Sequence, residues 1–135
     1  MNCLFCKIAN GEIPANIVYE DDLTLAFLDI NPVNPGHTLV IPKKHFRNIF
    51  DIEEEQAEAV MRTTLKVANA IKSSLRPDGM NLFQCNEAAA TQEVFHFHLH
   101  IIPRFEDDSI VLQWNQQQGE PEELKKIAKK IKASL

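Results

Sequence analysis

His96, His98 and His100 stand at alternate positions of the chain, separated by single apolar residues. Near neutral pH an imidazole can act as a nucleophile, as a general acid or base, or as a metal ligand. The alternation predicts a β-strand over residues 94–103, with successive side chains on opposite faces. We expect the three histidines to share one face, about 6.6 Å apart at a rise of ~3.3 Å per residue. The apolar residues between them should face the core.

Cys3 and Cys6 form a Cys-x₂-Cys pair, a spacing that can place two thiolates on one zinc ion. Two more ligands must come from elsewhere, and His45 and one of the alternating histidines are the candidates. A hydrolase that uses the alternating histidines themselves as zinc ligands is an alternative interpretation. The third cysteine, Cys85, lies in an apolar run, so we expect it to be a small buried core residue.

The length of 135 residues is typical of one domain with its own hydrophobic core, and we expect a single domain over residues 1–135. The formal net charge of −5 argues against nucleic-acid binding, which needs a basic surface. No apolar run approaches the ~20 residues of a membrane span, and no signal peptide is visible. We therefore expect a cytoplasmic protein with neither nucleic-acid nor membrane partners.

Periodicity and turn residues predict the elements that must position these side chains. A long helix should begin at a capping box formed by Asp51 and Glu54 and end before Pro77. A second, amphipathic helix should begin at Pro121 and reach the end of the chain. The expected strands span residues 17–20, 23–30, 38–41, 80–85 and 94–103. This order favours an α+β fold with a five-stranded, mainly antiparallel sheet.

The segment from His96 to Ile102 resembles the histidine-triad signature, His-φ-His-φ-His-φ-φ with φ apolar, at every position. Companion segments stand in family order at residues 3–8, 27–30 and 36–43. The chain is similar to the histidine triad (HIT) family, in its Hint-like bacterial branch, over residues 3–105, with a C-terminal loop and helix at 106–135. The resemblance implies a HIT-like fold, a homodimer and a purine-nucleotide pocket. It also implies transfer or hydrolysis of a nucleoside monophosphoryl group, from phosphoramidates, acyl adenylates or dinucleoside polyphosphates.

The resemblance assigns a role to each matching residue. His98 matches the nucleophile, which attacks the α-phosphate and forms a nucleotidyl-histidine that water then cleaves. His100 and His37 match positions that flank the phosphate and offset its charge, and Asp29 matches the carboxylate that accepts from the ribose hydroxyls. The implied base pocket comprises Phe5, Ile8, Phe27, Leu28, Ile30 and Leu39, for each of which core packing is the alternative. Polar contacts to the phosphate or leaving group are implied for Asn86 and Gln92.

The resemblance also implies two further zinc ligands beside the cysteine pair. In relatives that bind structural zinc, the ligands resemble Cys3, Cys6, His45 and His96. A closed Cys₂His₂ site is typical of structural zinc, whereas catalytic zinc keeps an open position. We therefore expect a structural zinc ion that leaves His98 free for chemistry, and no catalytic cofactor is required.

Two departures from the family pattern lie just before the triad. The loop at residues 86–93 carries three alanines where relatives are glycine-rich, and glycine allows a backbone to approach a phosphate closely. Glu93 replaces a hydroxyl donor with a carboxylate, which only accepts hydrogen bonds and repels phosphate. We expect Glu93 to weaken activity on the usual phosphoramidates or to shift the leaving group toward a cationic amine. The alternative function is a nucleotide-binding dimeric regulatory module with little catalytic activity.

Overall fold

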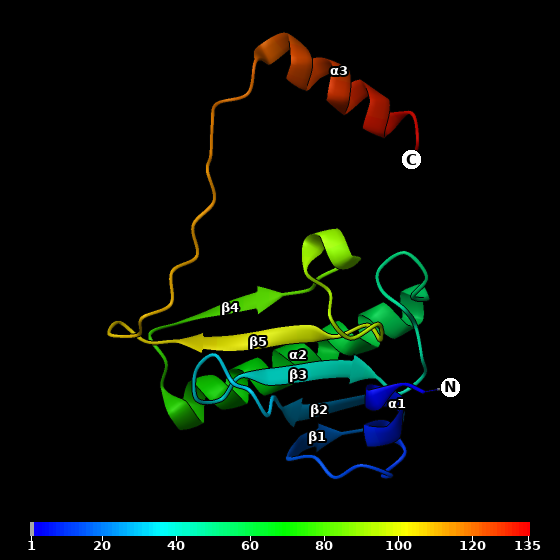
Figure 1. Ribbon diagram of the computed structural model, residues 1–135, viewed down its shortest axis with the longest axis vertical. Coiled ribbons are helices and arrows are strands. Elements are labelled where there is room, and N and C mark those ends of the chain that lie inside the picture. Colours follow the sequence, from blue (N-terminus) through cyan, green and yellow to red (C-terminus); the bar gives the residue numbers. More distant parts are fainter. Residues whose placement is uncertain (1) are drawn as a thin grey trace.

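The computed structural model describes residues 2–135 and contains a five-stranded sheet in the order β1-β2-β3-β5-β4 (Figure 1). Every neighbouring pair of strands is antiparallel. The strands are β1 (Ile17–Glu20), β2 (Thr24–Leu28), β3 (Thr38–Pro42), β4 (Gly79–Phe83) and β5 (Leu99–Arg104). The predicted α+β class, with five antiparallel strands, one long helix and a C-terminal helix, is confirmed.

One face of this sheet is covered by a helix, and a short helix packs at one end of the other face. The long helix α2 (Glu54–Leu75) crosses one face, and the short helix α1 (Leu4–Ala9) lies at the end of β2 and β3 (Figure 1). Side chains that alternate along the central strands therefore enter two separate clusters. The cluster against α2 includes Ala26, Val40, Leu99 and Ile101, and the cluster against α1 includes Leu25, Phe27, Leu39 and Ile41.

The predicted capping box at the start of α2 is wrong. The carboxylate of Asp51 accepts hydrogen bonds from the backbone N–H groups of Arg47 and Asn48, both at 3.0 Å. Asp51 therefore closes the preceding turn, and Glu53 occupies the N-cap position without a capping side-chain bond. The end of the helix agrees with the prediction, because Arg76 adopts a left-handed conformation directly after Leu75.

The strand predicted over residues 94–103 is shorter than its alternation suggests, because β5 begins only at Leu99. The backbone N–H of Phe97 donates to the carbonyl of Phe46 at 2.7 Å, so this part of the chain binds a loop rather than a neighbouring strand. Alternation still separates the two faces. Phe97, Leu99 and Ile101 pack in the α2-side core as expected, and the histidines lie on the other side.

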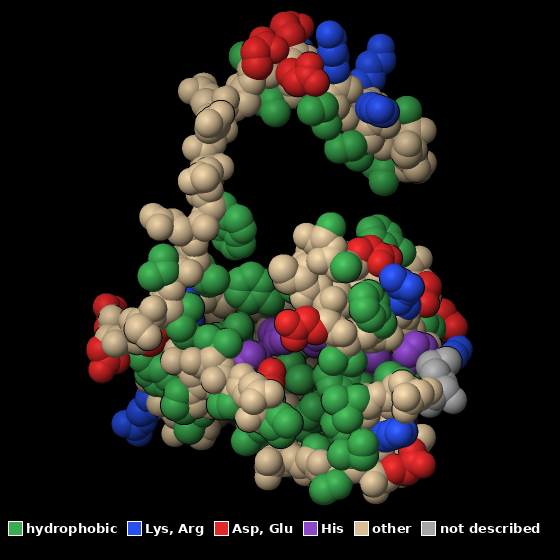
Figure 2. Space-filling model, in the orientation of Figure 1, with side chains coloured by type: hydrophobic (Ala, Val, Ile, Leu, Met, Phe, Trp, Pro, Cys, Tyr) green, Lys and Arg blue, Asp and Glu red, His purple; other side chains and the backbone are tan. Residues whose placement is uncertain are grey.

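The C-terminal helix α3 (Pro121–Lys132) begins as predicted, with Glu120 capping the first turn through its side chain. An extended segment at residues 106–120 carries it away from the sheet (Figure 1). Its apolar stripe of Leu124, Ile127 and Ile131 is exposed. Figure 2 shows hydrophobic side chains of α3 on the side of the helix that faces the rest of the molecule. Within residues 2–135, no helix is both long and apolar enough to cross a membrane.

Candidate active site

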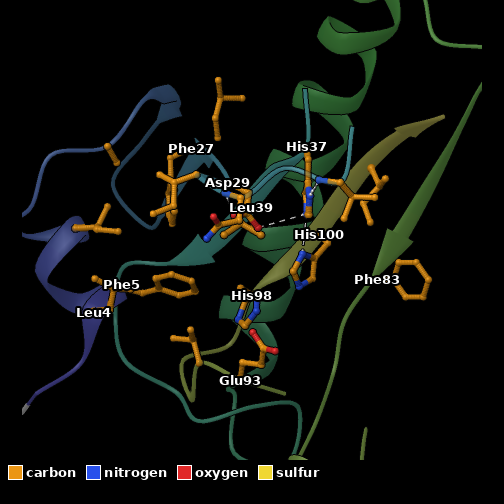
Figure 3. Close-up of a pocket in the computed structure, with 18 of the residues that line it drawn as sticks. Leu4, Phe5, Phe27, Asp29, His37, Leu39, Phe83, Glu93, His98 and His100 are labelled. Atoms are coloured by element: carbon orange, nitrogen blue, oxygen red, sulfur yellow. Dashed lines mark hydrogen bonds and ion pairs between the residues drawn. The ribbon is translucent and has the colours of Figure 1, made fainter. Parts of the chain in front are cut away.

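A cavity of about 520 Å³ lies where α1, the β2–β3 loop and the segment before β5 meet. This volume falls within the range of small-molecule and cofactor sites. Figure 2 shows histidine side chains in a hollow of the surface, bordered by hydrophobic and acidic side chains. His37, His98 and His100 line the cavity together with Asp29 and Glu93 (Figure 3). The tertiary structure thus brings the three predicted catalytic histidines into one site.

The imidazole of His98 is held in a single tautomer. Its Nδ1–H donates to the backbone carbonyl of His96 at 2.7 Å, so its Nε2 carries a lone pair. The ring is buried and meets Phe5 edge-on, with 5.1 Å between ring centroids. Burial lowers the pKa of His98, which favours the neutral form. A neutral imidazole with a free nitrogen is the chemical form that can attack phosphorus.

A chain of hydrogen bonds determines the tautomers of the other two histidines. The backbone N–H of Val33 donates to Nδ1 of His37 at 3.1 Å, so the proton of His37 resides on Nε2. That Nε2 lies 2.9 Å from Nδ1 of His100 and donates to it. The remaining proton of His100 is therefore on its Nε2. Burial, reinforced by His98 and His37, lowers the pKa of His100 to about 4, so His100 offers a neutral N–H donor.

Asp29 stands beside this chain at the end of β2. One carboxylate oxygen accepts from the backbone N–H of Asn31 at 2.8 Å, and the other lies 3.6 Å from Nε2 of His37. Because Asp29 also lines the cavity, its carboxylate can accept hydrogen bonds from a bound hydroxyl group. The geometry suits the ribose contact expected for this residue.

The apolar residues predicted for the base pocket form the wall nearest α1. Phe5 and Phe27 meet edge-on at 5.5 Å between ring centroids. The predicted set of Phe5, Ile8, Phe27, Leu28, Ile30 and Leu39 all line the cavity. Four of them, Phe5, Ile8, Phe27 and Leu39, are also buried core residues, so core packing and pocket formation coincide. Ile30 differs, because 82% of its surface is exposed at the cavity mouth.

The structure places two of the predicted polar contacts away from the cavity lining. Gln92 is buried; its amide N–H groups donate to the carbonyls of Arg47 and Val94, and its oxygen accepts from Asn48 and the backbone of Glu87. These four bonds use its full side-chain capacity.

Asn86 is likewise occupied, by Gln84 and by the backbone N–H of Ile49. Of the three polar residues predicted in this loop, Glu93 alone lines the cavity. In this structure the side chains of Gln92 and Asn86 hydrogen-bond within and next to the loop, and their contacts to a phosphate or leaving group stay a prediction.

Reasoning from the sequence missed several cavity residues, among them Phe83 and Cys85. Phe83 and Cys85 line the wall opposite α1, and Cys85 is only partly buried rather than a core residue. Phe83 ends β4 and Cys85 follows two positions later, so continued alternation along the extended chain could have placed them on one face. The missing information was which face of β4 is turned toward the histidines.

A second cluster lies behind the cavity. The side chains of Cys3, Cys6, His45 and His96 each offer one ligand atom, and these atoms lie within 4.8 Å of one another. Nε2 of His96 donates to the carbonyl of Pro42 at 2.8 Å, which leaves Nδ1 free to face the cysteines. That Nδ1 is 3.4 Å from Sγ of Cys3 and 3.2 Å from Nδ1 of His45.

These separations suit one tetrahedral ion. Zinc bonds to sulfur and nitrogen place ligand atoms roughly 3.3–3.8 Å apart. Burial and the neighbouring Cys3 raise the pKa of the Cys6 thiol to about 11, so a bound cation is needed to hold the thiolate form at neutral pH. Of the three alternating histidines, His96 alone joins the cysteines. The four residues could therefore hold a metal ion away from the cavity.

Fold and site together define a five-stranded antiparallel α+β protein with three neutral histidines in one cavity. The HIT domain family model matches residues 10–107. The chain therefore belongs to the HIT family.

Three relatives show how widely this sequence pattern occurs. Protein hit of Bacillus subtilis is 43% identical over 137 residues, covering 99% of this chain and 94% of that protein. Adenosine 5'-monophosphoramidase hnt1 of Schizosaccharomyces pombe is 38% identical over 136 residues, covering 100% and 99%. Adenylylsulfatase HINT3 of Arabidopsis thaliana is 42% identical over 109 residues, covering 81% of this chain and 55% of that protein.

Solved structures show the same architecture. A HIT family protein from Bacillus anthracis superimposes with a TM-score of 0.94 at 47% identity, covering 99% of this chain and 97% of that one. A zinc-bound histidine triad family protein from Mycobacterium smegmatis superimposes with a TM-score of 0.78 at 38% identity, covering 87% and 85%. The fold is thus shared with HIT proteins along nearly the whole chain.

Proposed function

We propose that the protein is a hydrolase or nucleotidyltransferase that acts on the α-phosphate of purine nucleoside monophosphoryl compounds through a nucleotidyl-His98 intermediate. The observation that carries this proposal is the hydrogen bond from Nδ1–H of His98 to the carbonyl of His96, which leaves Nε2 unprotonated in the cavity. Two relatives named as an adenylylsulfatase and an adenosine monophosphoramidase support nucleotide hydrolysis. Substrates are expected among phosphoramidates, acyl adenylates and dinucleoside polyphosphates.

The reaction divides into two displacements. In the first, Nε2 of His98 forms a bond to phosphorus while the bond to the leaving group breaks, and the leaving group keeps the electron pair and takes a proton from solvent. In the second, water attacks the same phosphorus and releases a proton to solvent, the bond to Nε2 breaks with its electron pair returning to nitrogen, and the nucleoside monophosphate departs. The N–H of His100 donates to a phosphate oxygen, where negative charge accumulates. Asp29 accepts from the ribose, and the apolar wall binds the base.

We also propose that Cys3, Cys6, His45 and His96 hold a structural zinc ion. The four ligand atoms fit a closed tetrahedral site, and the zinc-bound relative from Mycobacterium smegmatis supports it. Bound zinc would join the N-terminal segment to the segment that carries the nucleophile. The step at phosphorus uses no metal ion in this scheme.

We also propose that the protein is a homodimer and that it is located in the cytoplasm. The exposed apolar stripe of α3 supports association, because exposed apolar patches of this kind mark interaction sites. Sedimentation equilibrium should give twice the mass of the 15.4 kDa chain, and Ile127→Glu should weaken the association. Lys126→Glu, an exposed neighbour on α3, is the matched control. The cytoplasmic location stays a prediction from the sequence.

The covalent intermediate provides the direct test. The protein is mixed with an adenylyl substrate labelled at the α-phosphate, quenched with acid and measured for retained label. We expect label on the parent protein and none on His98→Ala. If no phosphoramidate or dinucleoside polyphosphate gives either label or turnover, the hydrolase proposal is wrong. Nucleotide binding by calorimetry would then support the dimeric regulatory module, which Glu93 in the cavity favours.

A further inference from the structure

The cavity proposed to bind a phosphate ester carries an unusual balance of charge. No lysine or arginine lines it within residues 2–135, whereas two carboxylates do, those of Asp29 and Glu93. Burial lowers the pKa of His37 and of His100, so these histidines do not supply positive charge at neutral pH. The lining is therefore acidic, although the proposed substrate contains an anionic phosphoryl group. A cationic group is therefore needed in the bound complex to offset the negative charge of the two carboxylates and the phosphoryl group.

Glu93 is the carboxylate without an internal partner. Asp29 is held by the backbone of Asn31 and lies near His37, whereas the exposed side chain of Glu93 forms no hydrogen bond or ion pair with the described part of the chain. Its backbone is nevertheless well positioned. The neighbouring Gln92 is buried with four hydrogen bonds, two of them to the carbonyls of Arg47 and Val94. Glu93 thus carries an unpaired carboxylate on a backbone that the hydrogen bonds of Gln92 hold in place.

The positions of the two carboxylates along the cavity differ. In Figure 3, Asp29 lies beside His37 at one end, Glu93 lies at the other, and His98 lies between them. A nucleotide with its ribose on Asp29 and its phosphorus at His98 extends its leaving group toward Glu93. The group beyond the scissile bond is therefore the part of the substrate that Glu93 can distinguish.

We infer that Glu93 selects substrates whose leaving group carries a second, cationic amine. This inference rests on the proposed function. As the bond between phosphorus and nitrogen breaks, the departing nitrogen keeps the electron pair and takes a proton from water, while His98 binds phosphorus. The second ammonium group takes no part in bond making; it pairs with Glu93 and neutralises the acidic wall. A neutral leaving group of the same size leaves the charge of Glu93 uncompensated beside the phosphate.

Two conjugates of adenosine monophosphate test this directly. One joins 1,3-diaminopropane to the phosphate through a P–N bond and keeps a terminal ammonium group; the other joins n-butylamine and ends in a methyl group. We expect kcat/KM to favour the cationic conjugate by about tenfold, as for one partly shielded ion pair. Glu93→Gln should bring the ratio close to one, and added salt should reduce the parent's ratio. Glu58→Gln, an exposed site on α2, should leave the ratio unchanged.

The outcomes separate this inference from the proposed function. If both conjugates turn over but the ratio is the same in the parent and in Glu93→Gln, the inference is wrong and the hydrolase proposal stands. If neither turns over, calorimetric binding of the two conjugates decides. A cationic preference lost in Glu93→Gln supports the inference without hydrolysis, and equal binding overturns it.

A divalent cation is the competing way to neutralise the wall, because ligand atoms of Asp29, His37 and His100 lie within 4.8 Å of one another. Turnover is therefore also measured with added Mg²⁺ and with chelator. A preference for the cationic conjugate that is the same in both conditions supports Glu93 as the selecting group. A preference abolished by Mg²⁺ overturns the inference.

Discussion

His96 binds His98 through its backbone carbonyl while its own imidazole faces the two N-terminal cysteines. Nδ1–H of His98 donates to this carbonyl at 2.7 Å. Nδ1 of His96 lies 3.4 Å from Sγ of Cys3. The proposed metal cluster and the proposed nucleophile are therefore supported by the same short piece of backbone. Positioning the side chain of His96 also positions the carbonyl that selects the tautomer of His98.

Removing the metal should reduce activity only through loss of the folded structure. Treatment with a strong chelator is expected to reduce activity slowly, in step with loss of the near-ultraviolet circular dichroism of the folded chain, because a structural ion supports folding rather than the reaction. Cys3→Ser combined with Cys6→Ser should lose bound zinc by elemental analysis and melt at lower temperature. Immediate loss of turnover with an unchanged fold would instead favour a zinc hydrolase.

His37 should act through His100. In His37→Ala, Nδ1 of His100 loses the donor at 2.9 Å, so the proton of His100 is no longer confined to Nε2. We expect kcat to fall about 10- to 100-fold, the scale for loss of a donor at a developing charge, with little change in KM. The double variant His37→Ala/His100→Ala should lose little more than the larger single loss. Fully additive losses would show that the two residues act independently.

Asp108 should stabilise the fold in a pH-dependent way. Arg104 together with backbone N–H groups of Phe105 and Ile110 lowers the pKa of this carboxyl well below its usual range. A lowered folded-state pKa contributes stability that is present above the unfolded pKa, about 3.9, and lost as the pH falls below it. Asp108→Asn should therefore reduce the urea midpoint at pH 7.

The difference between Asp108→Asn and the parent should shrink as the pH falls through 4. Asp107→Asn, an exposed neighbour, should behave like the parent at every pH. A gap between Asp108→Asn and the parent that stays constant from pH 7 to pH 3.5 would contradict this linkage.

Glu87 holds a backbone conformation that is nearly restricted to glycine. Its φ of 77° and ψ of 159° fall in a region that side chains disfavour, and its carboxylate bonds to Arg47 and Asn48 hold it there. Glu87→Gly should raise the melting temperature by a few degrees, because relief of backbone strain exceeds the loss of an exposed ion pair. Glu87→Ala keeps the strain, loses the pair and should melt below the parent. Equal melting of the two variants would show that the backbone is not strained.

Much of the fold follows from local patterns in the sequence. Alternation placed Leu99 and Ile101 in the core, and periodicity located the long helix, because burying one face requires a regular spacing of apolar side chains. Its predicted end before Pro77 agrees with its last residue, Leu75. The beginnings of α2 and β5 were predicted less well. Asp51 closes a turn instead of capping the helix, and Phe97 binds the loop at Phe46, since both partners lie outside the local pattern.

The sequence by itself determined which groups are available for chemistry: the histidines, the cysteine pair and an acidic residue where a hydroxyl is usual. Tertiary structure decided what each group faces. It turned Gln92 inward, left Glu93 in the cavity, placed His96 against the cysteines and set the proton positions of His98 and His100. The physical reason is that a tautomer or a ligand set depends on hydrogen-bond partners distant in sequence, and only the packed chain brings them within reach.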